Sequence, residues 1–376
     1  MILFFLVHAL IFVYLLIRVV FPLRSPLTVK VVLALIFLLV SQHNLVRRAF
    51  GQMSTPELAG PFIIVEGVCF AALLFFFLLV LADDMLALVR LVARRGRRAR
   101  TRFSPGRRKA MLAFAAAVPA VWGVREAVIV PRVNAMEARS AKVPAGLDGL
   151  VIVHVADLHV SPLYNEDWTR ALVERINALA PDLIFITGDV VDGTPGTRGE
   201  AIAPLAGLRA RHGVFGCMGN HEYYGDFRGW QGAFPKLGLT MLENRHEVVA
   251  IGGERIVIAG VTDEVAGRFG LPLPDSAAAL EGAPAGALRI MLEHRPSRAA
   301  YNAAAGADLQ FSGHTHGGQI LGMNRLVARF NQGFVYGWYA VDGMRLYVTS
   351  GAGLWNGFPV RLGVPSEIAR VVLRSV

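Results

Sequence analysis

Four apolar runs in the first 130 residues constrain the fold of this chain more than any other feature. They cover residues 2–23, 27–46, 61–81 and 111–130. A helix needs about 20 mostly apolar residues to cross a bilayer, so the runs predict about four transmembrane helices. Arg125 and Glu126 interrupt the fourth run, and for this run the alternative is an amphipathic helix that lies on the membrane surface.

The composition divides the chain at about residue 142. Hydrophobic residues make up 54% of the 376 residues, which is more than one soluble globular domain usually contains. The excess lies almost entirely in the first part of the chain. We therefore predict a transmembrane region over residues 1–142 and a globular domain over residues 143–376.

The net charge changes at the same place. Residues 1–142 contain 19 Lys and Arg against 6 Asp and Glu, whereas residues 143–376 contain 19 against 22. The formal charge of +10 therefore belongs to the membrane region. The globular domain carries a net charge of −3, which argues against a nucleic acid as its partner.

A basic segment between the third and fourth runs predicts the orientation in the membrane. Residues 90–109 contain ten Lys and Arg, and such loops usually lie on the cytoplasmic side. With four spans, the N-terminus and residues 143–376 would both lie outside. A contact of the basic segment with anionic lipids is compatible with this placement. If the fourth run lies on the surface instead, the globular domain stays inside.

Residues 143–376 have the pattern of an α/β domain. Short apolar runs rich in Val, Ile and Leu alternate with alanine-rich helical stretches such as residues 166–180. The predicted strands lie in GLVIVHVAD, PDLIFITGD, GVFGCMGNHE, LRIMLEH, ADLQFSGHTH, MRLYVTSG and SEIARVVLRSV. A hairpin with Gly252 and Gly253 at its turn is expected in HEVVAIGGERIVIAGV.

Five of the predicted strands end in polar side chains that can bind a metal ion. These side chains are Asp157 with His159, Asp189, Asn220 with His221, His294, and His314 with His316. Strand ends meet at one edge of an α/β sheet, so we expect these side chains to converge. A polar surface turn would explain one His-x-His pair, but not five strand ends together. Carboxylate, imidazole and amide ligands without a thiolate favour Mn²⁺, iron or Zn²⁺ over a cysteine-type structural zinc site.

Five motifs in this order resemble those of a known family. The motifs DLHV, GDVVD, GNHE, LEH and GHTHGGQ resemble the signature of the calcineurin-like metallophosphoesterase superfamily. GHTHGGQ and a late element, residues 359–361 (PVR) with 365–368 (PSEI), are similar to a bacterial membrane-associated group within it. The resemblance covers about residues 148–376. It implies an α/β fold, a four-layer α-β-β-α sandwich, preceded here by the helical transmembrane region.

The resemblance also implies which residues form the site. It assigns one divalent metal ion to Asp157, His159, Asp189 and His316, and a second to Asp189, Asn220, His294 and His314. A carboxylate shared in this way can hold two cations about 3.5–4 Å apart, and a water between them becomes the nucleophile for in-line attack on phosphorus. His221 is then free to act as the general acid, oriented by Asp192, unless it is only a hydrogen-bonded turn residue. Glu222 either takes part at the family's acidic position or supports the ligands.

The implied reaction is hydrolysis of a phosphomonoester, a phosphodiester or a pyrophosphate of a lipid or small molecule. We expect a multi-pass protein of the bacterial inner membrane, with its catalytic domain on the extracytoplasmic face. One alternative is a hydrolase of the UDP-2,3-diacylglucosamine type, which acts in lipid A synthesis on the cytoplasmic side. Another is a catalytically silent metal-binding sensor or scaffold, although every motif position is filled. An aromatic segment follows the His-x-His pair and forms either an apolar lip for a lipid or part of the core; it contains Phe330, Phe334, Tyr336, Trp338 and Tyr339.

Overall fold

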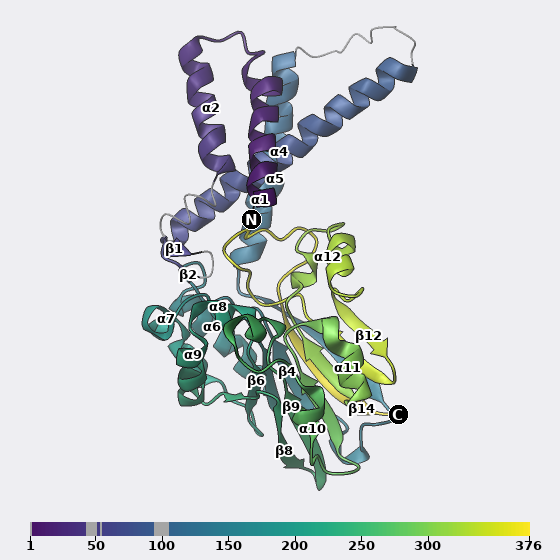
Figure 1. The fold of residues 1–376 in the computed structure, drawn as a ribbon. Coiled ribbons are helices and arrows are strands. Elements are labelled where there is room, and N and C mark those ends of the chain that lie inside the picture. Colours follow the sequence, from purple (N-terminus) through teal and green to yellow (C-terminus); the bar gives the residue numbers. More distant parts are fainter. Residues whose placement is uncertain (1, 43–50, 53–54, 94–104) are drawn as a thin grey trace. The chain divides into compact units, whose positions relative to one another are not determined.

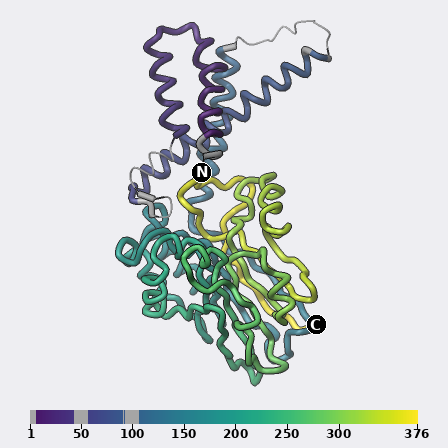
Figure 2. Tube along the Cα trace, in the orientation of Figure 1, coloured from purple at the N-terminus to yellow at the C-terminus, as the bar shows by residue number. Residues whose placement is uncertain are grey.

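The structure is a computed structural model that describes residues 2–42, 51–52, 55–93 and 105–376 (Figures 1 and 2). It contains two compact units. One is helical and comprises residues 1–53, 61–125 and 357–360, and the other contains the large β-sheets and comprises the rest of the chain.

The helical unit contains four helices among the described residues. They are α1 (Ile2–Leu15), continued by a π-helical turn (Leu16–Val20), α2 (Leu27–Ser41), α4 (Gly60–Ala93) and α5 (Pro105–Val128). Two short strands, β1 (Gly51–Gln52) and β2 (Thr55–Pro56), pair with each other between α2 and α4 in the chain.

Two stretches of the described helices are long and apolar enough to cross a membrane, as judged by length and composition alone. They are Gly60–Arg90 in α4 and Gly106–Val128 in α5. The second spans about 34 Å at 1.5 Å per residue, against a hydrocarbon core of about 30 Å. Helix α5 continues through Arg125 and Glu126, where the sequence suggested an interruption.

The first two predicted spans also contain apolar helices. Among the described residues these are Leu6–Val20, within the helix that begins at Ile2, and Leu27–Ser41. The end of the second run, residues 43–46, and residues 94–104 of the basic segment lie outside the described residues. Two of the four predicted spans are thus helices of spanning length in the described part of the chain, and the four spans stay a prediction.

Polar and apolar contacts hold the helical unit together. The Tyr14 hydroxyl donates a hydrogen bond of 2.6 Å to Asp84 on α4, and Arg18 forms an ion pair with the same carboxylate. Charged groups in apolar helices are expected to pair in this way, because an isolated charge is costly to bury. An apolar cluster joins α1, α4 and α5; it includes Ile11, Leu15, Leu73, Phe76 and Ala116.

The other unit contains two six-stranded sheets. The strand order of the first is β3 (Arg132–Ser140), β14 (Glu367–Ser375), β4 (Val151–Val155), β5 (Leu183–Thr187), β6 (Val214–Cys217) and β7 (Thr240–Met241). The order of the second is β12 (Gly337–Val341), β13 (Met344–Val348), β11 (Leu309–Ser312), β10 (Leu288–Leu292), β9 (Glu254–Gly260) and β8 (Arg245–Ile251). Strands β4, β5 and β6 are parallel in the first sheet, and β10 and β11 are parallel in the second.

The two sheets form the inner layers of a sandwich. The core between them includes Phe185 and Phe215 from the first sheet and Ile290 and Phe311 from the second. A second apolar cluster packs the outer face of the second sheet against α10 (Ser276–Leu280) and α11 (Ala299–Ala304). Helix α6 (Glu166–Asn177) belongs to the other helical layer, and every residue of β5 is buried, as expected for a strand that is covered on both faces. The α/β sandwich predicted from the sequence is therefore confirmed.

Strand β3 was not predicted. It pairs in parallel with β14 over all nine of its residues. Charged residues such as Arg132, Glu137 and Arg139 hide its strand pattern, because it lies at the edge of the sheet with most side chains at least partly exposed. The first sheet therefore includes residues before the predicted domain boundary at residue 143. The predicted β8–β9 hairpin is present, with Gly252 and Gly253 at its turn at φ angles of 59° and 84°.

Candidate metal centre

The candidate ligands lie at the carboxyl ends of strands from both sheets. Asp157, Asp189 and Asn220 follow β4, β5 and β6 of the first sheet within three residues. His294 and His314 follow β10 and β11 of the second sheet in the same way. Parallel neighbours present their carboxyl ends at the same edge, so both sheets bring polar side chains to one place.

Three overlapping groups of side chains could each hold a metal ion, because their ligand atoms lie within 4.8 Å of one another. The groups are Asp157 with His159 and His316, Asp189 with His294 and His314, and His159 with Asp189 and His221. Asp189 and His159 each belong to two groups. The structure thus brings together six of the seven predicted ligands and the predicted acid.

The seventh predicted ligand, Asn220, reaches this cluster through an arginine. Its Oδ1 accepts a hydrogen bond of 2.9 Å from Nη2 of Arg295, whose Nη1 lies 3.0 Å from Nε2 of His314. Arg295 is held by Asp263, which accepts a hydrogen bond of 2.8 Å from its Nε. Arg295 was not predicted from the sequence, where its only signal is its place directly after His294.

The imidazole orientations fit a metal ion. His294 donates from Nδ1 to the carbonyl oxygen of Thr187 at 2.9 Å, which leaves Nε2 3.2 Å from Oδ2 of Asp189. Nδ1 of His159 lies 3.0 Å from Asp192, and its buried Nε2 has no hydrogen-bond partner among the described residues. This Nε2 lies 3.8 Å from Oδ2 of Asp189. A histidine that binds a divalent cation through one ring nitrogen usually donates a hydrogen bond from the other, which fixes the orientation of the ring. His159 and His294 are both held in this way, with Nε2 near the carboxylate of Asp189.

The backbone at the site is in an unusual conformation. Five of the predicted ligands have a positive φ angle: 54° at Asp157, 47° at His159, 50° at Asp189, 71° at His314 and 49° at His316. Residues other than glycine rarely adopt this left-handed region, and each instance costs on the order of 1–3 kcal/mol. Such strain gathers at functional sites, where the surrounding structure holds it in place.

Gly188 is needed for the close approach of the loops. A Cβ atom there would lie 2.5 Å from the backbone nitrogen of Gly219 and 2.7 Å from Nδ1 of His294. Its φ angle of 79° also suits glycine. The contact between the ends of β5, β6 and β10 therefore depends on this glycine in the predicted motif GDVVD.

Glu222 holds the ligand loops in place. Its buried carboxylate accepts hydrogen bonds from the backbone nitrogens of Asp189, Val190, Val191 and Gly219, at distances of 2.7 to 3.1 Å. Each of these amides would cost about 1–3 kcal/mol if it were buried without a partner. Of the two interpretations of Glu222, this geometry favours support of the ligands.

Asp192 contacts two histidines at once. Its Oδ1 lies 2.6 Å from Nδ1 of His221 and 3.0 Å from Nδ1 of His159, and its Oδ2 accepts a hydrogen bond of 3.1 Å from Asn356. Asp192 is fully buried. The sequence predicted the contact with His221 but neither of the other two, because Asn356 lies far away in the chain with no motif around it.

The electrostatics of the site favour bound positive charge. Burial raises the pKa of Asp157 to about 6, whereas neighbouring histidines outweigh burial at Asp189 and hold its pKa well below the usual range. Burial would lower the pKa of His221 and His294, but Asp189 and other carboxylates raise these values to about 9 and about 10. A histidine must be neutral to bind a metal ion, so a cation would replace the proton on His294.

Comparison with known proteins places this site in a family. The family model described as calcineurin-like phosphoesterase matches residues 150–318. A Danio rerio "transmembrane protein with metallophosphoesterase domain" is 34% identical over 269 residues, which cover 69% of this chain and 61% of that protein. An uncharacterized metallophosphoesterase of Bacillus subtilis is 32% identical over 247 residues, covering 63% of this chain and 83% of that protein. An uncharacterized metallophosphoesterase of Aquifex aeolicus is 30% identical to this chain, and the match covers 92% of that protein.

The chain spans only part of some relatives, namely 61% and 63% of the length of the Danio rerio and Bos taurus proteins. Among solved structures, a calcineurin-like phosphoesterase from Bacillus subtilis matches with a TM-score of 0.37 and 16% identity, covering 56% of this chain and 82% of that one. At this score the structural match adds no argument beyond the sequence relatives. Those relatives and the strand-end cluster agree on one conclusion. The chain belongs to the calcineurin-like metallophosphoesterases, a family of metal-dependent hydrolases that act on phosphoester bonds.

Proposed function

We propose that this chain is a membrane-anchored phosphoesterase that holds two divalent metal ions between the carboxyl ends of its two sheets. The observation that carries the proposal is the sharing of Asp189 and His159 between groups of ligand atoms within 4.8 Å. Mn²⁺, iron and Zn²⁺ all suit the mixture of carboxylate, imidazole and amide ligands. The proposed substrate is a phosphoester or pyrophosphate of a lipid or a small molecule.

Each ligand has a proposed place. Asp157, His159 and His316 would hold one ion, Asn220, His294 and His314 would hold the other, and both would share Asp189. Bound ions supply an activated water and neutralise the charge that develops on the phosphoryl oxygens. Asp189 suits the shared role because its carboxylate lies 3.2 Å from Nε2 of His294 and 3.8 Å from Nε2 of His159.

His221 is the proposed general acid. Asp192 holds its Nδ1 at 2.6 Å, so that Nε2 faces the cluster 3.9 Å from Asp189. The buried carboxylate of Asp192 lies against Nδ1 and so favours the protonated imidazole, with a proton on Nε2. The imidazole donates this proton to the leaving oxygen, and Asp192 stabilises the orientation that this transfer requires.

Metal dependence tests the proposed function. We expect the full chain, reconstituted in lipid nanodiscs, to hydrolyse bis(4-nitrophenyl) phosphate in the presence of Mn²⁺. Exhaustive chelation should abolish the activity, and Mn²⁺ added back should restore it, because the ligands position both the nucleophile and the phosphoryl group through the ions. Full activity after metal analysis has shown that the protein is metal-free would refute the proposal. The full chain is required, because a fragment that begins at residue 143 lacks β3.

We also propose that the catalytic unit lies on the extracytoplasmic face of a bacterial inner membrane. Residues 90–109 carry ten Lys and Arg and lie between the two helical stretches of spanning length. Transfer of each charge through hydrocarbon costs about 2.5–3.5 kcal/mol, which favours a cytoplasmic position for this segment. If α5 then crosses the membrane, the β-sheet unit is outside, however many of the earlier helices span.

Reporter fusions after Val376 test this orientation. We expect a fusion to alkaline phosphatase to be active in a bacterial host and a fusion to a conventional green fluorescent protein to be dark. The opposite result would place the catalytic unit in the cytoplasm and overturn the proposed orientation. A cytoplasmic nucleotide-linked lipid of the UDP-2,3-diacylglucosamine type would then become the better substrate proposal.

A further inference from the structure

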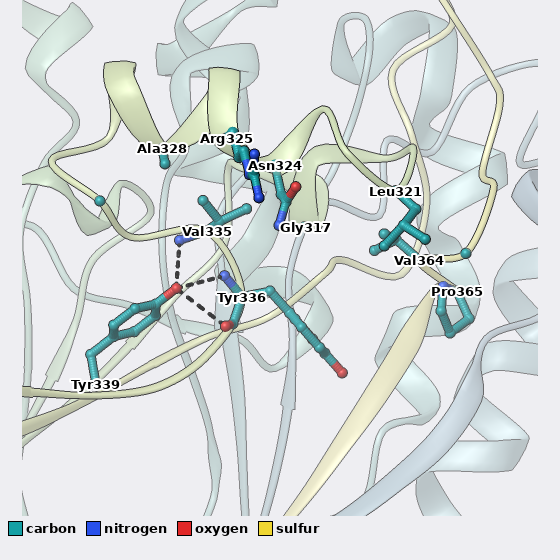
Figure 3. Close-up of a pocket in the computed structure, with 12 residues that line it drawn as sticks. Gly317, Leu321, Asn324, Arg325, Ala328, Val335, Tyr336, Tyr339, Val364 and Pro365 are labelled. Carbon is teal, nitrogen blue, oxygen red and sulfur yellow. Dashed lines mark hydrogen bonds between the residues drawn. The ribbon is translucent and has the colours of Figure 1, made fainter.

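A pocket opens beside the segment that follows the His-x-His pair. It has a volume of about 390 Å³ and lies between the segment that follows His316 and the loop before β14. Leu321, Val364 and Pro365 lie together on one side of it, and Tyr339 lies on the opposite side (Figure 3). Volumes of a few hundred cubic ångströms are typical of small-molecule sites with mainly apolar walls.

The backbone that carries the metal ligands forms part of the pocket. Gly317, the residue after the predicted ligand His316, lines it. Between the two histidines of the His-x-His pair, Thr315 donates a hydrogen bond of 2.6 Å to the carbonyl oxygen of Val335 in the opposite wall. A molecule in this pocket therefore lies next to the residues that would hold the metal ions.

Hydrogen bonds fix the other walls. The backbone of Leu321 donates to the carbonyl oxygen of Leu362 at 2.8 Å, which joins the segment after the histidines to the loop before β14. The Tyr339 hydroxyl accepts hydrogen bonds of 3.0 and 3.2 Å from the backbone nitrogens of Val335 and Tyr336 (Figure 3). The pocket is thus a built cavity and does not depend on loose side chains.

Exposed apolar side chains are concentrated around the rim of this pocket. Helix α12 (Asn324–Phe330) has no buried residue. Of twelve large hydrophobic side chains exposed in the β-sheet unit, five fall in the sixteen residues 321–336: Leu321, Met323, Leu326, Phe330 and Tyr336. Leu321 and Phe330 are each 76% exposed. A concentrated apolar patch of this kind indicates a binding surface, whereas scattered exposed residues would not.

The aromatic residues of this segment divide between rim and core. Trp338 packs against Phe311 and Tyr347 in the core between the sheets, with ring centroids 6.3 and 5.0 Å apart. Phe330 and Tyr336 are exposed. The segment therefore contributes both to an apolar lip, through Phe330 and Tyr336, and to the core, through Trp338.

Positive charge lines one side of the pocket. Arg325 belongs to the lining, and Asn324 and Arg325 lie together on the α12 side (Figure 3). Neither Arg325 nor Arg329, its neighbour on the helix, forms an ion pair with the described part of the chain. An apolar pocket with an arginine at its edge complements a molecule that joins a hydrocarbon chain to an anionic group.

We propose that this pocket binds the alkyl or acyl chain of a phosphoester substrate whose phosphate lies at the metal centre, with Arg325 near the anionic head. The proposal rests on the proposed phosphoesterase function and assigns its substrate to the lipids or other amphiphiles. Occupancy of the pocket by the chain of the substrate makes catalytic efficiency depend on chain length.

Chain length therefore provides the test. Burial of one methylene group strengthens binding up to about fourfold. We expect kcat/KM of the full chain in nanodiscs, with Mn²⁺, to rise at least tenfold from 4-nitrophenyl ethyl phosphate to 4-nitrophenyl hexyl phosphate. Each variant is judged by its hexyl-to-ethyl ratio, which is kcat/KM for the hexyl substrate divided by kcat/KM for the ethyl substrate. The partition of each substrate into the nanodisc lipid is the same for all variants, so it does not affect the comparison of their ratios.

Two substitutions remove the binding space in different ways. Ala328→Trp fills the pocket, and Leu321→Ala removes an apolar wall that is 76% exposed, so that its loss does not endanger folding. We expect both to bring the hexyl-to-ethyl ratio close to one. Leu273→Ala is the matched control, because Leu273 is a leucine of the same unit that is 59% exposed and lies outside both the pocket lining and the apolar segment 321–336, and we expect it to keep the wild-type ratio.

The possible outcomes separate this proposal from the one it rests on. No metal-dependent hydrolysis of bis(4-nitrophenyl) phosphate by the wild type would refute both. Hydrolysis of that chainless substrate together with a wild-type hexyl-to-ethyl ratio near one would overturn the pocket proposal and leave the phosphoesterase intact. A high ratio that survives in Leu321→Ala and Ala328→Trp would also overturn it, as would an equal loss in Leu273→Ala, which would show that the loss does not depend on the pocket.

Discussion

Replacing Asp189 by Asn should lower the activity of the full chain toward bis(4-nitrophenyl) phosphate about a thousandfold and remove most of its bound metal. Asp189 belongs to two of the three ligand groups, and its Oδ2 lies 3.8 Å from Nε2 of His159 and 3.2 Å from Nε2 of His294. Asparagine keeps the shape of the side chain and tolerates the φ angle of 50°, but it loses the negative charge that two cations share. Steady-state kinetics and elemental analysis of the same preparation measure both effects.

The chain offers a matched control for this substitution. Asp342 is exposed and also has a positive φ angle, 45°, so Asp342→Asn repeats the chemical change in the same backbone conformation. We expect it to keep wild-type activity and metal content. His159→Ala should be less damaging than Asp189→Asn, because His159 is proposed to bind one ion. Wild-type metal content in Asp189→Asn would contradict the bridging role.

His221→Ala should lower activity by about 10² to 10⁴ on a substrate that releases an alkoxide, with little loss of bound metal. This range is typical for removal of a general acid. A nitrophenolate leaves readily without a proton, so the loss on bis(4-nitrophenyl) phosphate should be at least tenfold smaller. The comparison needs the rates of both substrates with wild type and variant, measured at the same metal occupancy.

His212→Ala is the control for this variant. His212 is a half-buried histidine that belongs to none of the ligand groups, and we expect its substitution to affect the two substrates equally and slightly. Equal large losses on both substrates in His221→Ala would show that His221 acts on metal binding or on folding instead. A loss of bound metal in this variant would lead to the same conclusion, because His221 lies within ligand distance of His159 and Asp189.

The sequence predicted the position of the site because its ligands follow buried strands. Runs such as LIFIT are almost entirely apolar. The polar residues that follow each run lie at the carboxyl edge of a sheet. The order of strands within each sheet did not matter for this prediction. Parallel pairing brings Asp157 and Asp189 to one edge of the first sheet and His294 and His314 to one edge of the second, and the packing of the two sheets then joins the two pairs.

The sequence suggested Glu222 as a support of the ligands, but the contacts of the supporting residues could not be predicted, because they arise from tertiary structure. Glu222 reaches four backbone amides only after the loop that follows β5 turns through the left-handed conformation at Gly188 and Asp189 and meets the loop that follows β6. Asn356 meets Asp192 across 164 residues of chain. Arg295 resembles any surface arginine in the sequence, yet it contacts two predicted ligands.

Element boundaries were predicted least well where hydrophobicity was the only guide. The charged strand β3 lacks an alternating apolar pattern, and its place in the sheet depends on β14, which lies more than two hundred residues later in the chain. In the helical unit, Arg125 and Glu126 interrupt the apolar run, but the helix itself continues through them to Val128. Glu126 forms an ion pair of 3.0 Å with Arg132.

Titration of the metal-depleted full chain with Mn²⁺ tests the central claim most directly. Bound metal and phosphodiesterase activity are measured together at each step, by elemental analysis after rapid desalting and by release of nitrophenolate. Two sites that share Asp189 predict that bound metal saturates at two ions per chain and that most of the activity appears with the second. Saturation of metal and activity at one ion per chain would contradict the dinuclear site.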